Sequence, residues 1–467
     1  MVDRVKLEGH DIYPAKVEGS QDVFGVRRVT FQKSRWMLDD EAIMCPMCRN
    51  KFNQLRRKHH CRQCGKILCS KCCKEKVPLP QLGLEEPERI CEICRPVTEM
   101  VTKSYSPLKE FLQDSAKCLS AAVSDSLSIK EVVELGGLHT LIYLAKEEDQ
   151  TIRHHVVSGL HVLSMHEPLH PILAEAGAIK ALCSILSSVT PAQLQTTIDG
   201  TSALMLFCKS ADLKKKAIED GALQVVLSLC EYEMPVSLLS VRILGLIVEH
   251  PGTHQTVAEN NRNTIPRILQ LIASEDEQMQ EVALKTLVHL SSGKTLHRHK
   301  IVQDELSAGC VILKAIRNQP RNLQVLNNAV CLIANLAIGE EDQNALRDHL
   351  DCVCDLINSQ SANRDLITHA TRAIGNFAKF KLNANQIVPH IPDIILHCLK
   401  SRYDSVQYQS LRIIIYLLAH STQKMKQALA SKDGSLDVLE GLVNVPGMID
   451  SIQTALLQNI PEVSAMP

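Results

Sequence analysis

The chain has 467 residues and a formal net charge of −1 at pH 7, so it is too long for one compact domain and carries no overall charge that would attract nucleic acid or an anionic membrane. Only 3% of the residues are aromatic, which favours helices rich in Leu, Ile and Ala over a β-sandwich or barrel. The chain shows no signal peptide, no lipidation motif and no apolar run of the roughly 18 residues that a membrane span needs. We therefore expect a cytoplasmic protein whose 18 cysteines are reduced.

Residues 1–35 form an N-terminal extension of mixed composition, in which "FGVRRVTF" (24–31) predicts a short strand. Nine cysteines then lie between positions 45 and 94, and eight of them form Cys-x2-Cys pairs. The four pairs are Cys45 with Cys48, Cys61 with Cys64, Cys69 with Cys72, and Cys91 with Cys94.

Each Cys-x2-Cys turn supplies two soft ligands, and zinc takes four at the corners of a tetrahedron. Eight thiolates therefore predict two structural zinc ions, in preference to an iron–sulfur cluster or redox cysteines. The segment has few apolar residues, so metal binding would supply its folding energy. The spacing leaves open whether the pairs bind in sequence or interleave as a cross-brace.

Cations crowd the same segment. Residues 49–76 contain ten Lys or Arg residues against the single acid Glu75, a net of +9 in a chain of net −1. This indicates an anionic partner, either phosphate in a lipid headgroup or nucleic acid, although a solvated charged face is the simpler alternative. We expect no nucleic acid, because no aromatic stripe or recognition helix accompanies the cations. His59 and His60 are further candidate zinc ligands, but the eight cysteines already satisfy two ions.

Three short motifs in this segment resemble the signatures of FYVE zinc fingers: "WMLDD" (36–40), "RKHHCR" (57–62) and "RIC" (89–91). The resemblance covers residues 36–96 and implies an interleaved cross-brace with Cys73 left over. It assigns one zinc to Cys45, Cys48, Cys69 and Cys72, and the other to Cys61, Cys64, Cys91 and Cys94.

The same resemblance implies a ligand, phosphatidylinositol 3-phosphate, which marks early endosomal membranes. Trp36 would support the lipid pocket, and the loop tip at Gln54 and Leu55 would enter the bilayer. That tip is only half apolar, so we expect modest insertion and a second membrane signal or avidity. The implied lipid contacts are Arg57, Lys58, Arg62 and Arg89 to the phosphates, His59 and His60 to phosphate and ring hydroxyls, and Asp39 to inositol hydroxyls.

After a connector at 97–107, an apolar pattern recurs every 41 to 44 residues. Such a period predicts an α-solenoid of about eight units, each burying its apolar face against its neighbours. "ELGGL", "EAGAI" and "EDGAL" predict glycine turns between helices, and the whole pattern resembles armadillo repeats over 108–458, before a tail at 459–467. The equivalent core residues are Leu144, Ile185, Leu229, Leu271, Ala315, Leu356, Cys398 and Leu442.

Some armadillo proteins hold extended peptides with ladders of Asn and Trp, and Asn335 and Asn376 match that position. The equivalent positions nearby are His289 and Tyr416, and the repeats contain no Trp, which disfavours that mode of peptide binding. The two Asn side chains would bond either a partner's backbone or neighbouring helix ends.

Taken together, the sequence predicts a mostly α protein, an armadillo-like solenoid preceded by a small two-zinc FYVE finger. The expected function is that of an adaptor that sits peripherally on early endosomes and recruits an unidentified protein through its repeats. The alternative is a RING-like ubiquitin ligase or its adaptor. Nucleophile-elbow, phosphate-loop, zinc-protease and kinase motifs are missing from the sequence, so we expect no enzyme.

Overall fold

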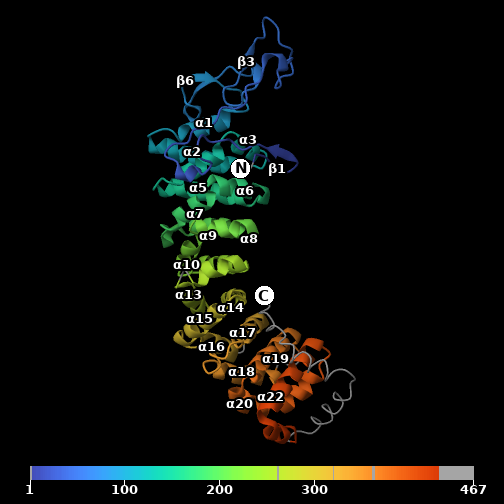
Figure 1. The fold of residues 1–467 in the computed structure, drawn as a ribbon. Coiled ribbons are helices and arrows are strands. Elements are labelled where there is room, and N and C mark those ends of the chain that lie inside the picture. The colour runs from blue at the N-terminus through green and yellow to red at the C-terminus, as the bar shows by residue number, and fades with distance from the viewer. Residues whose placement is uncertain (1–2, 260–261, 319, 360–362, 431–467) are drawn as a thin grey trace. The chain divides into compact units, whose positions relative to one another are not determined.

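The computed structural model describes residues 3–259, 262–318, 320–359 and 363–430. The chain divides into two units, 1–240 and 241–467. Figure 1 shows a strand-bearing part near the N-terminus and helices through the rest of the described chain. No single described helix is long and apolar enough to cross a membrane. One pair, Glu167–Ala176 with Ala178–Leu186, meets that test only when taken together, and it is bent by 74°.

The first unit contains three antiparallel two-stranded sheets, each closed by a short connection. The second and third sheets carry the cationic and cysteine-rich motifs, so their hairpins position the candidate site. The sheets are β1 (Val5–Leu7) with β2 (His10–Ile12), β3 (Lys58–His60) with β4 (Ile67–Cys69), and β5 (Lys76–Leu79) with β6 (Leu84–Arg89).

Helices begin at α1 (Arg95–Lys103), which includes most of the predicted connector and packs against α2 (Lys109–Val123). Three-helix repeats follow, and the third helices of neighbouring repeats pack side by side, as α2 does with α5 and α5 with α8. The repeats are α3 (Ile129–Glu134), α4 (Gly137–Leu144) and α5 (Gln150–Ser164); α6 (His170–Ala176), α7 (Ala178–Leu186) and α8 (Leu194–Lys209); and α9 (Ala211–Glu219), α10 (Ala222–Leu229) and α11 (Val236–Val248).

The second unit continues the same pattern, with α14 packed on α17, α17 on α19, and α19 on α22. Its helices are α12 (His254–Ala258), α13 (Thr264–Ile272), α14 (Glu277–Ser291), α15 (Thr295–Ser307), α16 (Val311–Arg317), α17 (Leu323–Leu336), α18 (Arg347–Ser359), α19 (Arg364–Ala378), α20 (Ala384–Ile387), α21 (Ile391–Asp393) and α22 (Asp404–Ala430). Short turns of 3-10 or π helix are η1 (Val23–Gly25), η2 (Asp39–Glu41), η3 (Pro80–Leu82), η4 (Glu167–Leu169), η5 (Pro191–Gln193), η6 (Pro251–Thr253), η7 (Lys381–Asn383), η8 (Val388–His390) and η9 (Ile394–Leu399).

The core positions confirm the predicted solenoid. Seven of the eight residues proposed as equivalent, from Leu144 to Cys398, are buried in the second helix of successive repeats, and Leu442 lies outside the described residues. Gly136, Gly177 and Gly221 adopt φ values of 91°, 95° and 97°, a left-handed conformation that favours glycine where one helix ends and the next begins.

In several repeats a polar side chain bonds to a backbone carbonyl group at the end of the preceding helix. In each case its nitrogen lies within 3.0 Å of the backbone carbonyl oxygen six residues earlier. Three residue types perform this task, so the same bond is made while the residue at this position differs. The residues are His170, His254, Gln343 and Asn383.

The predicted strand at 24–31 is wrong. Val23–Gly25 is a 3-10 turn, and Phe31 forms only an isolated bridge with Val17. The physical reason is that the carbonyl groups of this segment accept hydrogen bonds from solenoid side chains instead of a second strand. These bonds run from Tyr105 Oη to Val29 O (2.7 Å), from Tyr143 Oη to Arg27 O (3.0 Å), and from Lys146 Nζ to Val26 O.

Candidate functional site

The eight paired cysteines gather into two groups of four. Within each group the thiol sulfurs all lie within 4.8 Å of one another. The first and third pairs make one group and the second and fourth make the other, which is the interleaved arrangement that the resemblance implies. The groups are Cys45, Cys48, Cys69 and Cys72, and Cys61, Cys64, Cys91 and Cys94.

The spacing of the sulfurs fits zinc. Zn–S bonds of about 2.3 Å in a tetrahedron place neighbouring sulfurs about 3.8 Å apart. Cys48 Sγ and Cys69 Sγ, which come from different pairs, are 3.8 Å apart. All the ligands are thiolates, the donor that structural zinc sites prefer. Each group is therefore the site of one structural zinc ion.

Tight turns shape the cysteine pairs for this task. The carbonyl oxygen of Cys61 accepts a hydrogen bond from the backbone N–H of Gly65 at 2.9 Å. Gly65 has a φ of 71°, and a Cβ there would lie 2.1 Å from the carbonyl oxygen of Arg35, so only glycine fits. The backbone N–H of Cys91 donates to Cys61 Sγ at 3.3 Å, which joins the second and fourth pairs directly.

Cys73, the ninth cysteine of the segment, lies outside both groups. Its side chain is fully buried, and the neighbouring Cys61 together with burial raises the pKa of its thiol. Cys72, by contrast, belongs to the first group.

Strand β3 presents the central cations and histidines. Lys58, His59 and His60 form the strand itself, between Arg57 and the Cys61 turn. The backbone N–H of Arg62 donates to the carbonyl oxygen of Arg89 at 2.8 Å, which brings the end of β6 beside this segment. The second and third motifs of the sequence therefore meet at one edge of the finger.

Arg62 and Arg89 are both held by groups that the sequence did not identify. Arg62 Nε lies 3.1 Å from Glu88 Oε2, and the guanidinium of Arg89 donates to the carbonyl oxygen of Cys73 at 2.9 Å. In the sequence Glu88 stands directly before the "RIC" motif, which was the one feature that could have pointed to it. Its pairing with Arg62 depends on the position of β6. These contacts orient the two guanidinium groups before any ligand arrives.

The first motif docks against β3 through Trp36. Its indole stacks on the imidazole of His60, and the Arg62 guanidinium lies 4.9 Å from the indole centroid. His60 Nε2 lies 2.8 Å from the carbonyl oxygen of Met37, so this nitrogen carries a proton and donates it. His60 is thus fixed from two sides, as a group that supports a pocket must be.

His59 and Lys58 have different environments. Burial, followed by the charges of Arg89 and Arg57, lowers the pKa of His59. The Lys58 ammonium donates to the backbone carbonyl oxygen of Asp39, and it lies 5.7 Å from the centroid of the Phe52 ring. Asp39 itself is exposed, and the bond from Lys58 goes to its backbone. Of the seven predicted lipid contacts, Lys58, His59 and His60 form β3, Arg57 and Arg62 flank that strand, Arg89 ends β6 and Asp39 begins η2.

The predicted membrane loop is a compact turn. The backbones of Asn53 and Arg56 donate to each other's carbonyl oxygens at 3.2 and 3.1 Å, and Asn53 Oδ1 accepts from the N–H groups of Leu55 and Arg56. This turn projects Gln54 and Leu55 into solvent, and Leu55 is 95% exposed.

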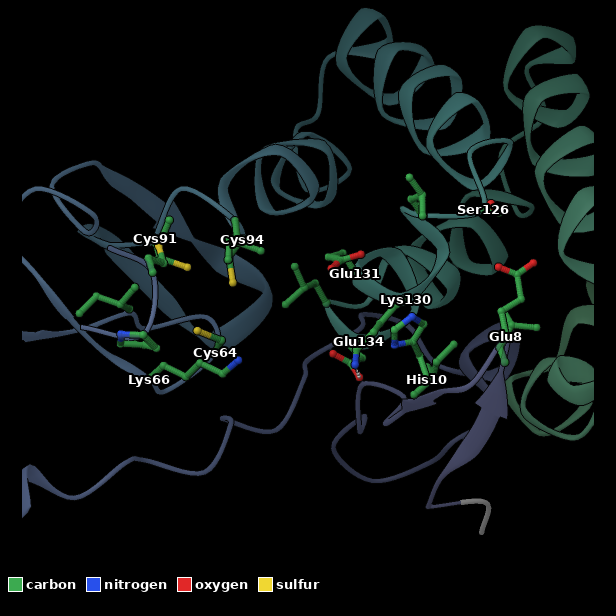
Figure 2. A pocket seen from close by; sticks show the side chains of 18 residues that line it. Glu8, His10, Cys64, Lys66, Cys91, Cys94, Ser126, Lys130, Glu131 and Glu134 are labelled. Atoms are coloured by element: carbon green, nitrogen blue, oxygen red, sulfur yellow. Dashed lines mark ion pairs between the residues drawn. The ribbon is translucent and has the colours of Figure 1, made fainter. Parts of the chain in front are cut away.

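A cleft lies beside the second zinc group. Figure 2 shows a cleft between the Cys64, Cys91 and Cys94 turns on one side and Glu131 and Glu134 of α3 on the other. Its volume is about 720 Å³. The sequence could not indicate this cleft, because its lining comes from five segments that are separate along the chain.

The two ladder asparagines are already engaged within the solenoid. Asn335 is fully buried; its Nδ2 donates to Ser291 Oγ at 2.9 Å, and its Oδ1 accepts from Arg372 at 2.8 Å. Asn376 likewise donates to a helix-end carbonyl oxygen and accepts from Arg412, both at 2.7 Å. The second alternative, that these side chains satisfy neighbouring helices, is therefore the one that the structure shows.

Comparison with known proteins gives independent support for both parts. Residues 35–100 match the FYVE zinc finger family. Over 60 residues, 13% of this chain, the chain is 43% identical to the lateral signaling target protein 2 homolog of Brugia malayi. That match covers 10% of the relative, so the chain spans about a tenth of the length of the curated relatives that it matches.

The structure also resembles solved structures. UNC-45 from Drosophila melanogaster matches with a TM-score of 0.59 at 16% identity, over 78% of this chain and 50% of that one. A crystal structure of an engineered protein matches with a TM-score of 0.53 at 18% identity, over 79% of this chain and 98% of that one. Identities this low describe the fold alone. Residues 35–100 of this chain are thus a FYVE zinc finger with two four-cysteine zinc sites, and the helical repeats that follow form an armadillo-like solenoid.

Proposed function

We propose that this protein is a non-catalytic adaptor that binds phosphatidylinositol 3-phosphate on early endosomal membranes and recruits a protein partner through its armadillo-like repeats. The observation that carries the proposal is the convergence of the three FYVE motifs. Trp36, His60 and Arg62 contact one another, and Arg62 is bonded to the backbone of Arg89.

This arrangement suits one phosphomonoester rather than a long polyanion. The guanidinium groups of Arg62 and Arg89 offer forked donors that match phosphate oxygens, and β3 adds the imidazole of His59, while His60 Nε2 is bonded to the carbonyl oxygen of Met37. Preorganisation lowers the entropic cost of collecting these cations around one ligand. Every member of the two zinc groups is a cysteine, which favours this reading over a RING-like ubiquitin ligase.

The repeats supply the protein-binding half of the proposal, by analogy with other solenoids of this kind. Because Asn335 and Asn376 are bonded internally, the partner would use other positions on the repeats.

The test is vesicle flotation against a panel of phosphoinositides, at fixed salt, with wild type, Arg62→Ala and Lys74→Ala. Lys74 is an exposed cation of the same finger that pairs only weakly with Glu75, so it controls for the loss of one charge. We expect selective binding to phosphatidylinositol 3-phosphate that falls strongly in Arg62→Ala and little in Lys74→Ala. Equal binding to all anionic vesicles, with both variants alike, would reject a specific pocket.

A further inference from the structure

Two large apolar side chains in the finger lie open to solvent just before the first zinc pair. Ile43 is 73% exposed and Met44 is 44% exposed, although the flanking Ala42 and Cys45 are buried. A pair of adjacent exposed apolar residues on a small, highly charged domain is a feature that points to a binding surface.

The backbone places this pair beside the membrane loop. Met44 forms an antiparallel bridge with Lys51, and the N–H of Phe52 donates to the carbonyl oxygen of Ile43 at 3.5 Å. Phe52 leads directly into the Asn53–Arg56 turn that exposes Leu55. Leu55 lies three positions after Phe52, a reach of at most about 10 Å in an extended chain.

Cations border the same surface. Lys51 lies opposite Met44, and Arg56 and Lys58 follow the loop. The exposed acids Asp39, Asp40 and Glu41 precede the pair on its other side, so the cations border this surface on the side of the membrane loop. Exposed apolar side chains next to Lys and Arg are the chemistry that anionic bilayers attract, since the cations meet headgroup charge while the apolar groups enter the acyl region.

We propose that Ile43 and Met44 extend the Leu55 loop into a ridge that enters the bilayer, and that this ridge is the second membrane anchor of the finger. This inference rests on the proposed function, because it deepens the same membrane contact. It also explains how a loop tip that is only half apolar, Gln54 with Leu55, can hold the finger on a membrane.

The experiment compares the full chain carrying Ile43→Gln and Met44→Gln with the full chain carrying Ile93→Gln. Ile93 is a matched control: it belongs to the same finger and is 56% exposed, but it lines the cleft beside the second zinc group. Each protein is titrated with vesicles containing phosphatidylinositol 3-phosphate and, separately, with a soluble short-chain form of that lipid. Zinc content is measured for all three, to show that the finger is intact.

We expect the double variant to bind vesicles about tenfold more weakly than wild type, the loss that follows when apolar side chains no longer leave water. Its affinity for the soluble lipid should be unchanged, and Ile93→Gln should match wild type in both titrations. Penetration of a lipid monolayer should fall in the same variant.

Equal vesicle affinity in the double variant and wild type would overturn the ridge while leaving the lipid pocket intact. A parallel loss of vesicle and soluble-lipid binding would overturn it as well, because the residues would then shape the pocket. Self-association of the wild-type protein that the double variant abolishes would assign the surface to a second copy instead. If the wild-type protein shows no binding to phosphatidylinositol 3-phosphate, both the proposed function and the ridge are overturned.

Discussion

The indole ring of Trp36 stacks on the imidazole ring of His60, with centroids 4.2 Å apart and planes inclined by 17°. The guanidinium of Arg62 lies over the same indole. One side chain therefore positions two of the groups assigned to the phosphate.

Replacing Trp36 with Ala should lower the affinity for soluble phosphatidylinositol 3-phosphate about tenfold, since an aromatic pair and a cation–π contact are each worth about 1 kcal/mol. Trp36→Phe should lose less, because it keeps an aromatic face. Trp36 is the only tryptophan of the chain, so a wild-type titration is readable from its fluorescence, and isothermal calorimetry measures the variants. Unchanged affinity in Trp36→Ala would show that the stack does not support the pocket.

Adjacent cysteines offer a sharp test of the zinc ligands. Cys72→Ser should lose zinc from the first group, because one of four thiolates is removed, while Cys73→Ser should retain two zinc ions per chain. Both residues are buried, so Cys73→Ser controls for the effect of a buried hydroxyl. Zinc analysis after gel filtration decides the outcome; two zinc ions in Cys72→Ser, or fewer than two in Cys73→Ser, would contradict the assignment.

A comparison of alanine substitutions at Gly136 and Gly221 tests how the N-terminal segment packs. Both have φ values above 90°, so alanine at either position carries the same strain of about 1–2 kcal/mol. Only at Gly136 would the new Cβ collide with another side chain, 2.4 Å from Phe31 Cζ; at Gly221 nothing lies within 4 Å.

We expect trypsin to cleave after Arg27 and Arg28 faster in Gly136→Ala than in wild type, because the displaced Phe31 loosens the segment. Gly221→Ala should be cleaved at the wild-type rate at these two bonds. Identical proteolysis of the two variants would show that Phe31 does not hold the segment in place.

Acid should weaken the N-terminus of α5 through Asp149. Burial alone would raise the pKa of Asp149, but hydrogen bonds from Lys109, the Ile152 N–H and Gln113 outweigh it and lower the pKa to about 2. Since the folded pKa lies below the ordinary value of 3.8, the carboxylate stabilises the fold above about pH 4, and this contribution is lost as the pH falls toward 2.

Asp149→Ala should therefore lower the opening free energy of α5 by about 1–2 kcal/mol at pH 7, with a smaller difference at pH 3. Hydrogen exchange of the α5 amides measures this locally. Asp149→Asn separates the effects, because it keeps a capping oxygen but loses the charge. A difference from wild type that does not shrink with acid would rule out the carboxylate as its source.

The buried pair of Asn335 and Arg372 should be strongly coupled. Removing the amide with Asn335→Ala strips a buried guanidinium of one acceptor, and we expect a loss of about 2–4 kcal/mol in the opening free energy of α17 and α19. Arg372→Met in the same chain should restore part of that loss. Hydrogen exchange across this double-mutant cycle checks the coupling, and strictly additive losses would refute it.

The periodic features of this protein could be predicted from its sequence, because each repeat has the same burial pattern. The core positions from Leu144 to Cys398 follow from a period of 41 to 44 residues, and the glycine turns follow from the conformational freedom that only glycine has. The N-terminal segment has no such redundancy. Its partners Tyr105 and Tyr143 lie 76 and 116 residues away, so no local pattern encodes where it packs.

Some features of the candidate site could likewise be predicted from the sequence, and others could not. Spacing indicated two zinc ions, but only resemblance indicated how the four cysteine pairs interleave. The pairing of Arg62 with Glu88 depends on where β6 lies, and the exposure of Ile43 depends on what the fold leaves uncovered. Such features arise from tertiary geometry and have no signature in the order of residues.

The N-terminal segment has a consequence for how this chain can be divided. It contacts the finger through the bond from the Phe31 N–H to Gln81 O, and the repeats through Ala15, whose N–H donates to Val133 O. The family match begins at residue 35, but the segment before it is hydrogen-bonded to both the finger and the repeats. A force that a membrane exerts on the finger would thus reach the first repeats through this N-terminal segment as well as through α1.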